Sequence, residues 1–223
     1  MNLVQLADRV LSEGLISCAR RAYGQINDQL KERHFGISTS SFVDLPALAH
    51  GSECERYEPL DYGSIYTIMS KLHISPADSL LDYGCGMGRV IVVACTKPFR
   101  SVIGVEVSSA LCRIARANVN SARNTSQASS VAIVEADATE FEVPDHVTIF
   151  WFFNPFYGAV MAKVIARIHA SLRRAPRRIV VVHVVPDNIS CPFGFVEWLR
   201  PTMKFRVGPW DQLTCLVFET ARQ

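Results

Sequence analysis

The sequence predicts an α/β domain built around a mostly parallel sheet. From Ser79 onward, short runs rich in β-branched residues alternate with stretches of helical periodicity, and this alternation is typical of βαβ units with right-handed crossovers. A glycine-rich turn joins the first of these strands to a helix. Near the C-terminus, two apolar runs are separated by a short segment containing Gly208-Pro209, so we expect them to form an antiparallel hairpin.

The elements follow one another in a regular order. We expect parallel strands at 79–83, 101–107, 131–135, 147–153 and 178–184, helices at 89–96, 109–122 and 158–172, and hairpin strands at 203–207 and 213–219.

The N-terminal part has a different character. Leu3, Leu6 and Val10 recur at helical spacing, which predicts an amphipathic helix over the first twenty-odd residues. Residues 36–52 contain serine, glycine and proline without a clear period, and we expect a loop there. A second helix follows Pro59. We therefore divide the chain into a helical cap or lid segment, 1–58, and a domain, 59–223.

Composition restricts the class of protein. With 223 residues, 49% hydrophobic and 20% charged, the chain can bury a substantial core. A net charge of +2 gives no argument for a nucleic-acid or membrane partner. The apolar runs 147–153 and 179–185 are much shorter than the ~20 residues of a membrane span. The N-terminus lacks the basic start and apolar block of a signal peptide.

The cysteines point to a reducing compartment. There are seven of them, an odd number, and none forms a C-x-x-C pair, so neither a disulfide framework nor a zinc site is indicated. We expect reduced thiols in a cytoplasmic protein, with no bound metal.

The sharpest signal is the glycine-rich turn itself. Gly84, Gly86 and Gly88 stand at alternate positions, directly after a strand that ends Asp82-Tyr83 and directly before a helix. Glycine lets the backbone turn tightly and approach a ligand, and the helix N-terminus offers unpaired N–H groups. The dinucleotide pattern G-x-G-x-x-G would need its third glycine at position 89, which is Arg89.

The segment from Asp82 to Gly88 resembles motif I of the class I S-adenosylmethionine (AdoMet)-dependent methyltransferases. The resemblance covers about residues 62–220. It implies a Rossmann-like, seven-stranded, mostly parallel sheet with an antiparallel C-terminal hairpin and helices on both faces. It also implies AdoMet as cofactor, bound at Asp82, Gly84, Gly86 and Gly88, and S-adenosylhomocysteine (AdoHcy) as product.

Two further acidic residues fit the same resemblance. Glu106 ends the second strand about 20 residues after the turn, where a carboxylate can accept hydrogen bonds from ribose hydroxyls. Asp137 follows the third strand, where family members bind the adenine amino group, with the backbone of Ala138 beside it. A surface carboxylate at Glu106 and an ordinary turn residue at Asp137 remain alternatives.

The end of the fourth strand carries the candidate catalytic residues. Asn154-Pro155-Phe156-Tyr157 resembles the Asn/Asp-Pro-Pro-Tyr/Phe signature of methyltransferases that act on planar amino groups. By this resemblance Asn154 and the carbonyl of Pro155 hold the nucleophile, and Tyr157 packs on its plane. Phe156 replaces the second proline of the signature, so the restriction that a following proline places on Pro155 is absent.

Three other features have two interpretations each. Tyr62 is a candidate cofactor contact because family members often use this region as a lid, but it also suits simple helix packing. His183 is either a general base, which an oxygen nucleophile would require, or a hydrogen-bonded core histidine. The basic residues near the fourth helix suggest RNA or DNA when taken alone, but they should face the edge opposite the ligand as a solvated surface; they are Lys163, Arg167, Arg173, Arg174, Arg177 and Arg178.

Three functions therefore compete. An active methyltransferase is favoured, with a protein or small-molecule acceptor preferred over nucleic acid. A nicotinamide-dependent oxidoreductase is disfavoured by the glycine spacing and by Asp137. A catalytically inactive AdoMet-binding interaction module is the third possibility.

Overall fold

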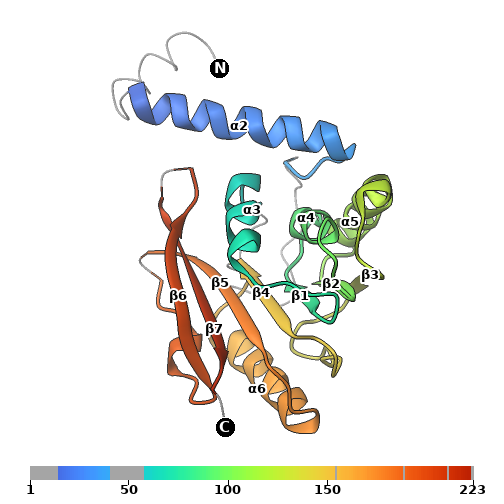
Figure 1. Ribbon diagram of the computed structural model, residues 1–223, viewed down its shortest axis with the longest axis vertical. Helices are drawn as coiled ribbons and strands as arrows, with labels where there is room; N and C mark the ends of the chain where they lie inside the picture. Colours follow the sequence, from blue (N-terminus) through green and yellow to red (C-terminus); the bar gives the residue numbers. More distant parts are fainter. Residues whose placement is uncertain (1–14, 41–57, 154, 188, 210, 222–223) are drawn as a thin grey trace.

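The computed structural model describes residues 15–40, 58–153, 155–187, 189–209 and 211–221. Its centre is a seven-stranded sheet with the order β3-β2-β1-β4-β5-β7-β6 (Figure 1). The strands are β1 (Ser79–Tyr83), β2 (Ser101–Glu106), β3 (Val131–Glu135), β4 (Ile149–Phe153), β5 (Val180–Pro186), β6 (Leu199–Val207) and β7 (Leu213–Thr220).

The strand directions confirm the predicted fold class. β1 to β5 pair in parallel, whereas β7 runs antiparallel to both β5 and β6. The prediction missed the first four residues of β6, which begins at Leu199. Pro201 is the reason, because proline argues against a strand in a sequence pattern. It is tolerated here because β6 is an edge strand and the register shifts between Pro201 and Met203.

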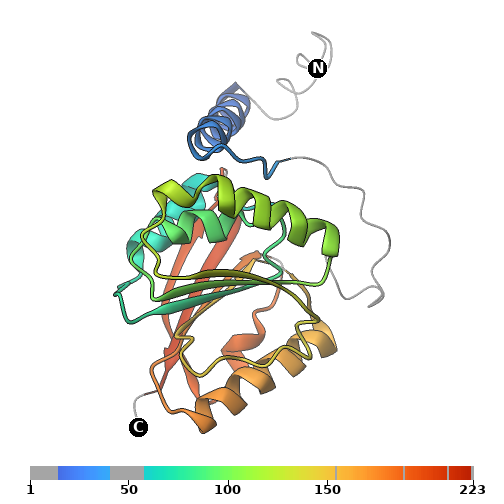
Figure 2. The ribbon, with the colours of Figure 1, turned by 90° about the vertical axis from the view of Figure 1, so that its right-hand side faces the viewer.

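The helices form layers on both faces of the sheet. α3 (Tyr62–Lys71), α4 (Arg89–Cys95) and α5 (Ser109–Ser121) cover one face, and α6 (Gly158–Arg174) covers the other together with the short 3₁₀ helix η3 (Pro192–Phe195) (Figure 2). α2 (Leu15–Phe35) lies outside the α3–α5 layer. One side of the sheet therefore carries two helical layers. A second 3₁₀ turn, η2 (Arg123–Thr125), follows α5.

The N-terminal helix is displaced from its predicted position. α2 continues to Phe35 rather than ending in the low twenties, and residues 1–14 lie outside the described ranges. Gly36, with φ of +66°, ends it, and the N–H of Ile37 donates to the carbonyl of Glu32 at 3.0 Å, a glycine-based C-terminal cap. Most of the expected loop 36–52 is not described. The division of the chain at residue 58 stays a prediction.

The core explains why the central strands read as unbroken apolar runs. Every residue of β1 and β2 is buried, as parallel strands covered on both faces should be. Trp151 and Leu80 face the α3–α4 side, whereas Tyr83 and Phe152 face the α6 side, where their rings stack at 5.2 Å.

Arg174, Arg177 and Arg178 lie toward the edge opposite the carboxyl ends of the parallel strands, as predicted, whereas Arg167 pairs with Glu140 in the loop after β3 at 2.9 Å. Arg174 pairs with Asp145 at 2.6 Å, and Arg178 pairs with Glu219 at 2.8 Å. Arg177 donates to the carbonyls of Val147 and Ser171. The contacts of Arg174 and Arg177 hold the end of α6. The placement of Arg174 and Arg178 agrees with the solvated-surface interpretation, and that of Arg167 does not match the predicted edge.

His183 belongs to the core on the α6 side. It is 3% exposed, its ring lies 5.3 Å from that of Phe193 and 6.2 Å from that of Phe152, and its Nδ1 lies 3.0 Å from the Sγ of Cys191. Burial lowers the pKa of His183 to about 4. The histidine is therefore neutral near pH 7, in agreement with the core interpretation.

This burial predicts a loss of stability in acid. A histidine with a pKa of about 4 in the folded chain and about 6.5 when unfolded binds fewer protons when folded, so stability falls as the pH drops from 6.5 to 4. The loss assigned to His183 is about 3 kcal/mol. Urea unfolding at pH 7 and pH 4 should show a smaller loss for His183→Gln than for the wild type. Equal losses in the two proteins would contradict the assignment.

Candidate functional site

Four loops meet at one edge of the sheet because β1 to β4 are parallel. They follow β1 at 84–88, β2 at 107–108, β3 at 136–141 and β4 at 154–157. In open α/β sheets, ligands bind outside the carboxyl ends of the strands, where the strand order reverses. Here the order reverses between β1 and β4, so the glycine-rich turn and the loop after β4 flank that point.

The glycine-rich turn needs its glycines for two separate reasons. Gly84, Gly86 and Gly88 have φ values of +73°, +54° and +83°, in the left-handed region that other residues rarely adopt. An added Cβ at Gly84 would lie 2.6 Å from the Cβ of Pro155, and one at Gly88 would lie 3.2 Å from the Cβ of Ala115. The turn is thus pressed against the loop after β4 on one side and against α5 on the other.

Asp82 provides a buried carboxylate beneath this turn. It is 3% exposed, and within the part of the chain that the structure describes no hydrogen bond or ion pair reaches its oxygens. Burial, and secondly the charge of Glu106, raise the pKa of Asp82 well above its usual range. Buried polar groups normally have partners, so a buried carboxylate without one indicates a position suited to a cationic ligand.

Glu106 is fixed by two backbone amides. Its Oε2 accepts from the N–H of Gly86 at 3.0 Å, and its Oε1 accepts from the N–H of Ser108 at 2.9 Å. Burial raises the pKa of Glu106, and the amide hydrogen bonds oppose this rise. The N–H of Val107 also acts on this carboxylate, and since a carboxylate has about four acceptor positions, acceptor capacity remains for a ligand. Gly86 thereby connects the turn directly to the end of β2.

Asp137 organises the loop after β3. Its Oδ1 accepts from the N–H of Thr139 at 2.8 Å, and its carbonyl accepts from the N–H of Phe141 at 2.9 Å. Asp137 and Ala138 are both half-buried. The turn lies at the carboxyl end of β3, next to the end of β2 that bears Glu106.

The loop after β4 brings one surprise. Asn154 lies outside the described residues. Phe156, the departure from the signature, is 7% exposed and packs edge-on against Tyr83 at 6.2 Å and Phe152 at 6.3 Å. An aromatic core contact thus anchors the loop where the signature has proline. Tyr157 is 46% exposed and stands at the N-terminal end of α6.

Arg89 is the residue that the sequence analysis missed. It is 4% exposed and forms ion pairs with Asp28 at 2.7 Å and Glu32 at 3.3 Å, both on α2. The signal was present: a cation in the first turn of a helix opposes the helix dipole, and the rest of α4 is apolar. Such a residue needs a partner elsewhere, which α2 supplies.

Tyr62 lies beneath Arg89 rather than at a surface. Its side chain is 0% exposed, the guanidinium carbon of Arg89 lies 4.6 Å from its ring centre, and the ring of Phe35 stacks at 6.4 Å. Packing, one of the two interpretations for Tyr62, accounts for this position. Its direct contact with a cofactor stays a prediction.

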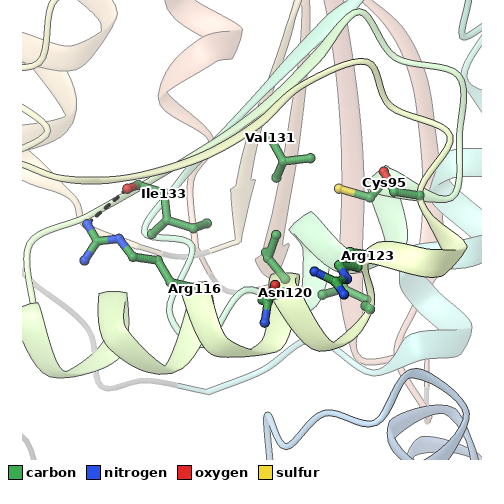
Figure 3. Close-up of a pocket in the computed structure, with 10 residues that line it drawn as sticks. Cys95, Arg116, Asn120, Arg123, Val131 and Ile133 are labelled. Atoms are coloured by element: carbon green, nitrogen blue, oxygen red, sulfur yellow. Dashed lines mark hydrogen bonds between the residues drawn. The ribbon is translucent and has the colours of Figure 1, made fainter.

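Two cavities lie outside the four loops. One of about 570 Å³ is formed at the carboxyl end of β5 by residues that include Cys191, Lys204 and Thr214. The other, of about 320 Å³, lies between α5 and β3 near the opposite edge, where Arg116 donates to the carbonyl of Ile133 at 3.1 Å (Figure 3).

Among the described residues, no helix is long and apolar enough to cross a membrane, and no cluster has metal-ligand character.

Comparison with solved structures supports the fold. An RNA methyltransferase from Salinibacter ruber, solved with AdoHcy, is 18% identical with a TM-score of 0.52, and the match covers 74% of this chain and 95% of that chain. An AdoMet-dependent methyltransferase from Aquifex aeolicus is 12% identical with a TM-score of 0.52, covering 70% and 89%. A precorrin 8W decarboxylase from Methanobacterium thermoautotrophicum is 16% identical with a TM-score of 0.52, covering 74% and 93%.

Sequence comparison identifies the domain. No curated protein matches the chain significantly. Residues 80–175 match a family model described as a methyltransferase domain, and this segment contains the glycine-rich turn, Glu106, Asp137 and the loop after β4. The match identifies residues 80–175 as a methyltransferase domain, and the order of the sheet agrees with the fold of the solved methyltransferases.

Proposed function

We propose that AdoMet lies across the ends of β1, β2 and β3, and that its methyl group passes to a nitrogen nucleophile held by the loop after β4. The observation that carries this proposal is the buried carboxylate of Asp82, which has no partner among the described residues, beneath a turn built from left-handed glycines. A methyltransferase needs a binding site for the amino-acid moiety of AdoMet, and this carboxylate and turn together provide one. The methyl acceptor is a protein or a small molecule.

The α-ammonium of AdoMet suits Asp82. It would bring a positive charge and N–H donors to a carboxylate whose pKa is raised by burial and by Glu106, and a charge-assisted hydrogen bond offsets the cost of burying the charge. The close contact of Gly84 with Pro155 leaves no room for a side chain at position 84. It holds the main chain of the turn close to the loop that would receive the methyl acceptor.

Glu106 and Asp137 would hold the nucleoside. The remaining acceptor capacity of Glu106 suits a ribose hydroxyl. Because Gly86 donates to Glu106, the same carboxylate fixes both the turn and the sugar. Asp137 with the backbone of Ala138 would receive the adenine, one strand further along the edge.

The acceptor would approach between the loop after β4 and β5. Phe153 pairs with Val184, so the end of β4 lies beside the part of β5 that leads into the Val185–Asp187 wall of the 570 Å³ cavity. Asn154 and the carbonyl of Pro155 would accept hydrogen bonds from the nucleophile, and Tyr157 would pack on it. His183 is neutral and enclosed by Phe152, Phe193 and Cys191, which favours nitrogen over an oxygen nucleophile that needs a base.

The chemistry requires alignment more than activation. AdoMet supplies an electrophilic methyl group on a good leaving group, and the residues of this chain would hold the nucleophile in line behind it, a contribution of several kcal/mol in well-oriented reactions.

We place the enzyme in the cytoplasm, because five described cysteines are free thiols, namely Cys85, Cys95, Cys112, Cys191 and Cys215.

The nucleoside contacts predict weaker binding in two variants. Glu106→Gln and Asp137→Asn should each weaken AdoHcy binding about tenfold or more, since each removes a hydrogen bond to a charged group. Calorimetry with AdoHcy, NADH and NADPH measures this, and we expect no binding of the nicotinamides. Asp145→Asn, at the opposite edge, is the control and should bind normally. If both site variants bind AdoHcy like the wild type, the assignment is wrong.

The ammonium contact predicts a pH dependence. The raised pKa of Asp82 means that the free enzyme holds a proton there at a higher pH than an ordinary aspartate does. An ammonium would lower that pKa, so binding should release the proton and tighten as the pH rises. AdoHcy titrations in two buffers of different ionisation enthalpy detect this release. Asp82→Asn should bind more weakly and release fewer protons. The same proton release in wild type and variant would rule out this role.

The acceptor loop predicts a separation of binding from turnover. Asn154→Ala should keep its affinity for AdoHcy but lose about tenfold or more of its methyl-transfer rate, because one hydrogen bond to the nucleophile is gone. Labelled AdoMet incubated with cell extract, before and after protease or nuclease treatment, measures the rate and identifies the acceptor class. Undiminished labelling by Asn154→Ala would exclude its role, and no labelling by the wild type would favour an inactive AdoMet-binding module.

A further inference from the structure

Residues 38–40 form a strap that joins α2 to the glycine-rich turn. The side chain of Asn118, on α5, donates to the carbonyls of Ser38 and Met87, each at 2.9 Å, and accepts from the N–H of Ser38 at 3.2 Å. One buried amide therefore ties the strap to the turn between Gly86 and Gly88. The strap continues into Thr39 and Ser40, which bind Arg89 at 2.6 Å each.

Arg89 uses its whole hydrogen-bonding capacity inside the protein. A guanidinium has five N–H donors. Its Nε donates to Thr39, Nη1 donates to Asp28 and the carbonyl of Leu60, and Nη2 donates to Glu32 and Ser40. No donor remains for the carboxylate of a ligand, so any influence of Arg89 on a cofactor must be transmitted through the residues that it holds.

The buried charge of Arg89 requires this network of partners. Arg89 places a buried cation at the N-terminal end of α4, where the helix dipole is also positive, and such a charge is tolerated only with paired and hydrogen-bonded partners. Asp28 and Glu32 supply two negative charges, at 18% and 14% side-chain exposure. Removing one of them disturbs the first turn of α4, directly after Gly88.

We propose that Arg89 and Asn118 are positioning residues that set the shape of the glycine-rich turn from α2. α2 and the strap lie outside residues 80–175, which match the methyltransferase domain, and yet they would determine how tightly that domain binds AdoMet. The inference rests on the proposed function for the site, because it assumes that AdoMet lies on this turn. It makes α2 a fixed part of the cofactor site rather than a free lid.

Glu32→Gln is the most informative variant. Among the described residues, Glu32 on α2 reaches the turn through Arg89 and the strap. The amide of glutamine keeps an acceptor for Thr39 while losing the charge. We expect AdoHcy to bind about tenfold more weakly to Glu32→Gln, Asn118→Ala and Arg89→Lys, because a charged or bidentate contact is lost in each. Gln29→Ala on α2 and Asn120→Ala on α5 are exposed controls and should bind like the wild type.

The kinetics separate positioning from mere stabilisation. In the full-length protein, the KM for AdoMet should rise in the three variants while kcat at saturating AdoMet stays within about twofold of wild type. If the melting temperature falls but the AdoHcy affinity of the folded variants is unchanged, the inference is overturned. Should Arg89→Lys fail to fold, Glu32→Gln and Asn118→Ala decide the question.

The same titrations keep this inference separate from the proposed function. If the wild type binds AdoHcy but Glu106→Gln and Asp137→Asn bind equally well, the proposed cofactor site fails and the inference fails with it. If those two variants weaken binding while Glu32→Gln and Asn118→Ala do not, only the positioning role is excluded.

Discussion

Gly84 and Pro155 belong to different loops, yet an added Cβ at Gly84 would lie 2.6 Å from the Cβ of Pro155. This contact is possible only because Gly84 has no side chain and adopts a φ of +73°. It brings the turn after β1 against the loop after β4, where the strand order reverses. The proposed donor and acceptor positions are neighbours for this reason, and a transfer reaction that depends on alignment gains most from such a contact.

The site is also defined by its buried acids. Asp82 and Glu106 lie at the ends of neighbouring strands, and burial raises the pKa of both. Glu106 is satisfied in part by the amides of Gly86 and Ser108, whereas Asp82 has no partner among the described residues. A ligand with an ammonium and a sulfonium complements this charge. Burying Asp82 without a partner lowers the stability of the folded protein, and functional sites commonly contain residues that do so.

A second set of charges supports the turn from behind. The Arg89 network holds α2, the strap 38–40 and the carbonyl of Leu60 to the beginning of α4, with the ring of Tyr62 beneath the guanidinium. Asn118 adds a neutral link from α5. The turn is thus held by contacts to the loop after β4, to α5 and, through Arg89, to α2. The N-terminal helix has a definite structural purpose in this arrangement.

Local sequence was sufficient for the elements of the sheet, the glycine-rich turn and the C-terminal hairpin, because period, β-branching and glycine spacing are properties of neighbouring residues. It also indicated Glu106 and Asp137, whose positions follow from strand ends. Only the tertiary structure decided the rest. Asp28 and Glu32 are far in sequence from Arg89, Phe156 inserts into a core formed by Tyr83 and Phe152, and Tyr62 is enclosed. Long-range pairing of charges and the filling of a core depend on which surfaces meet in space, and no local pattern encodes that.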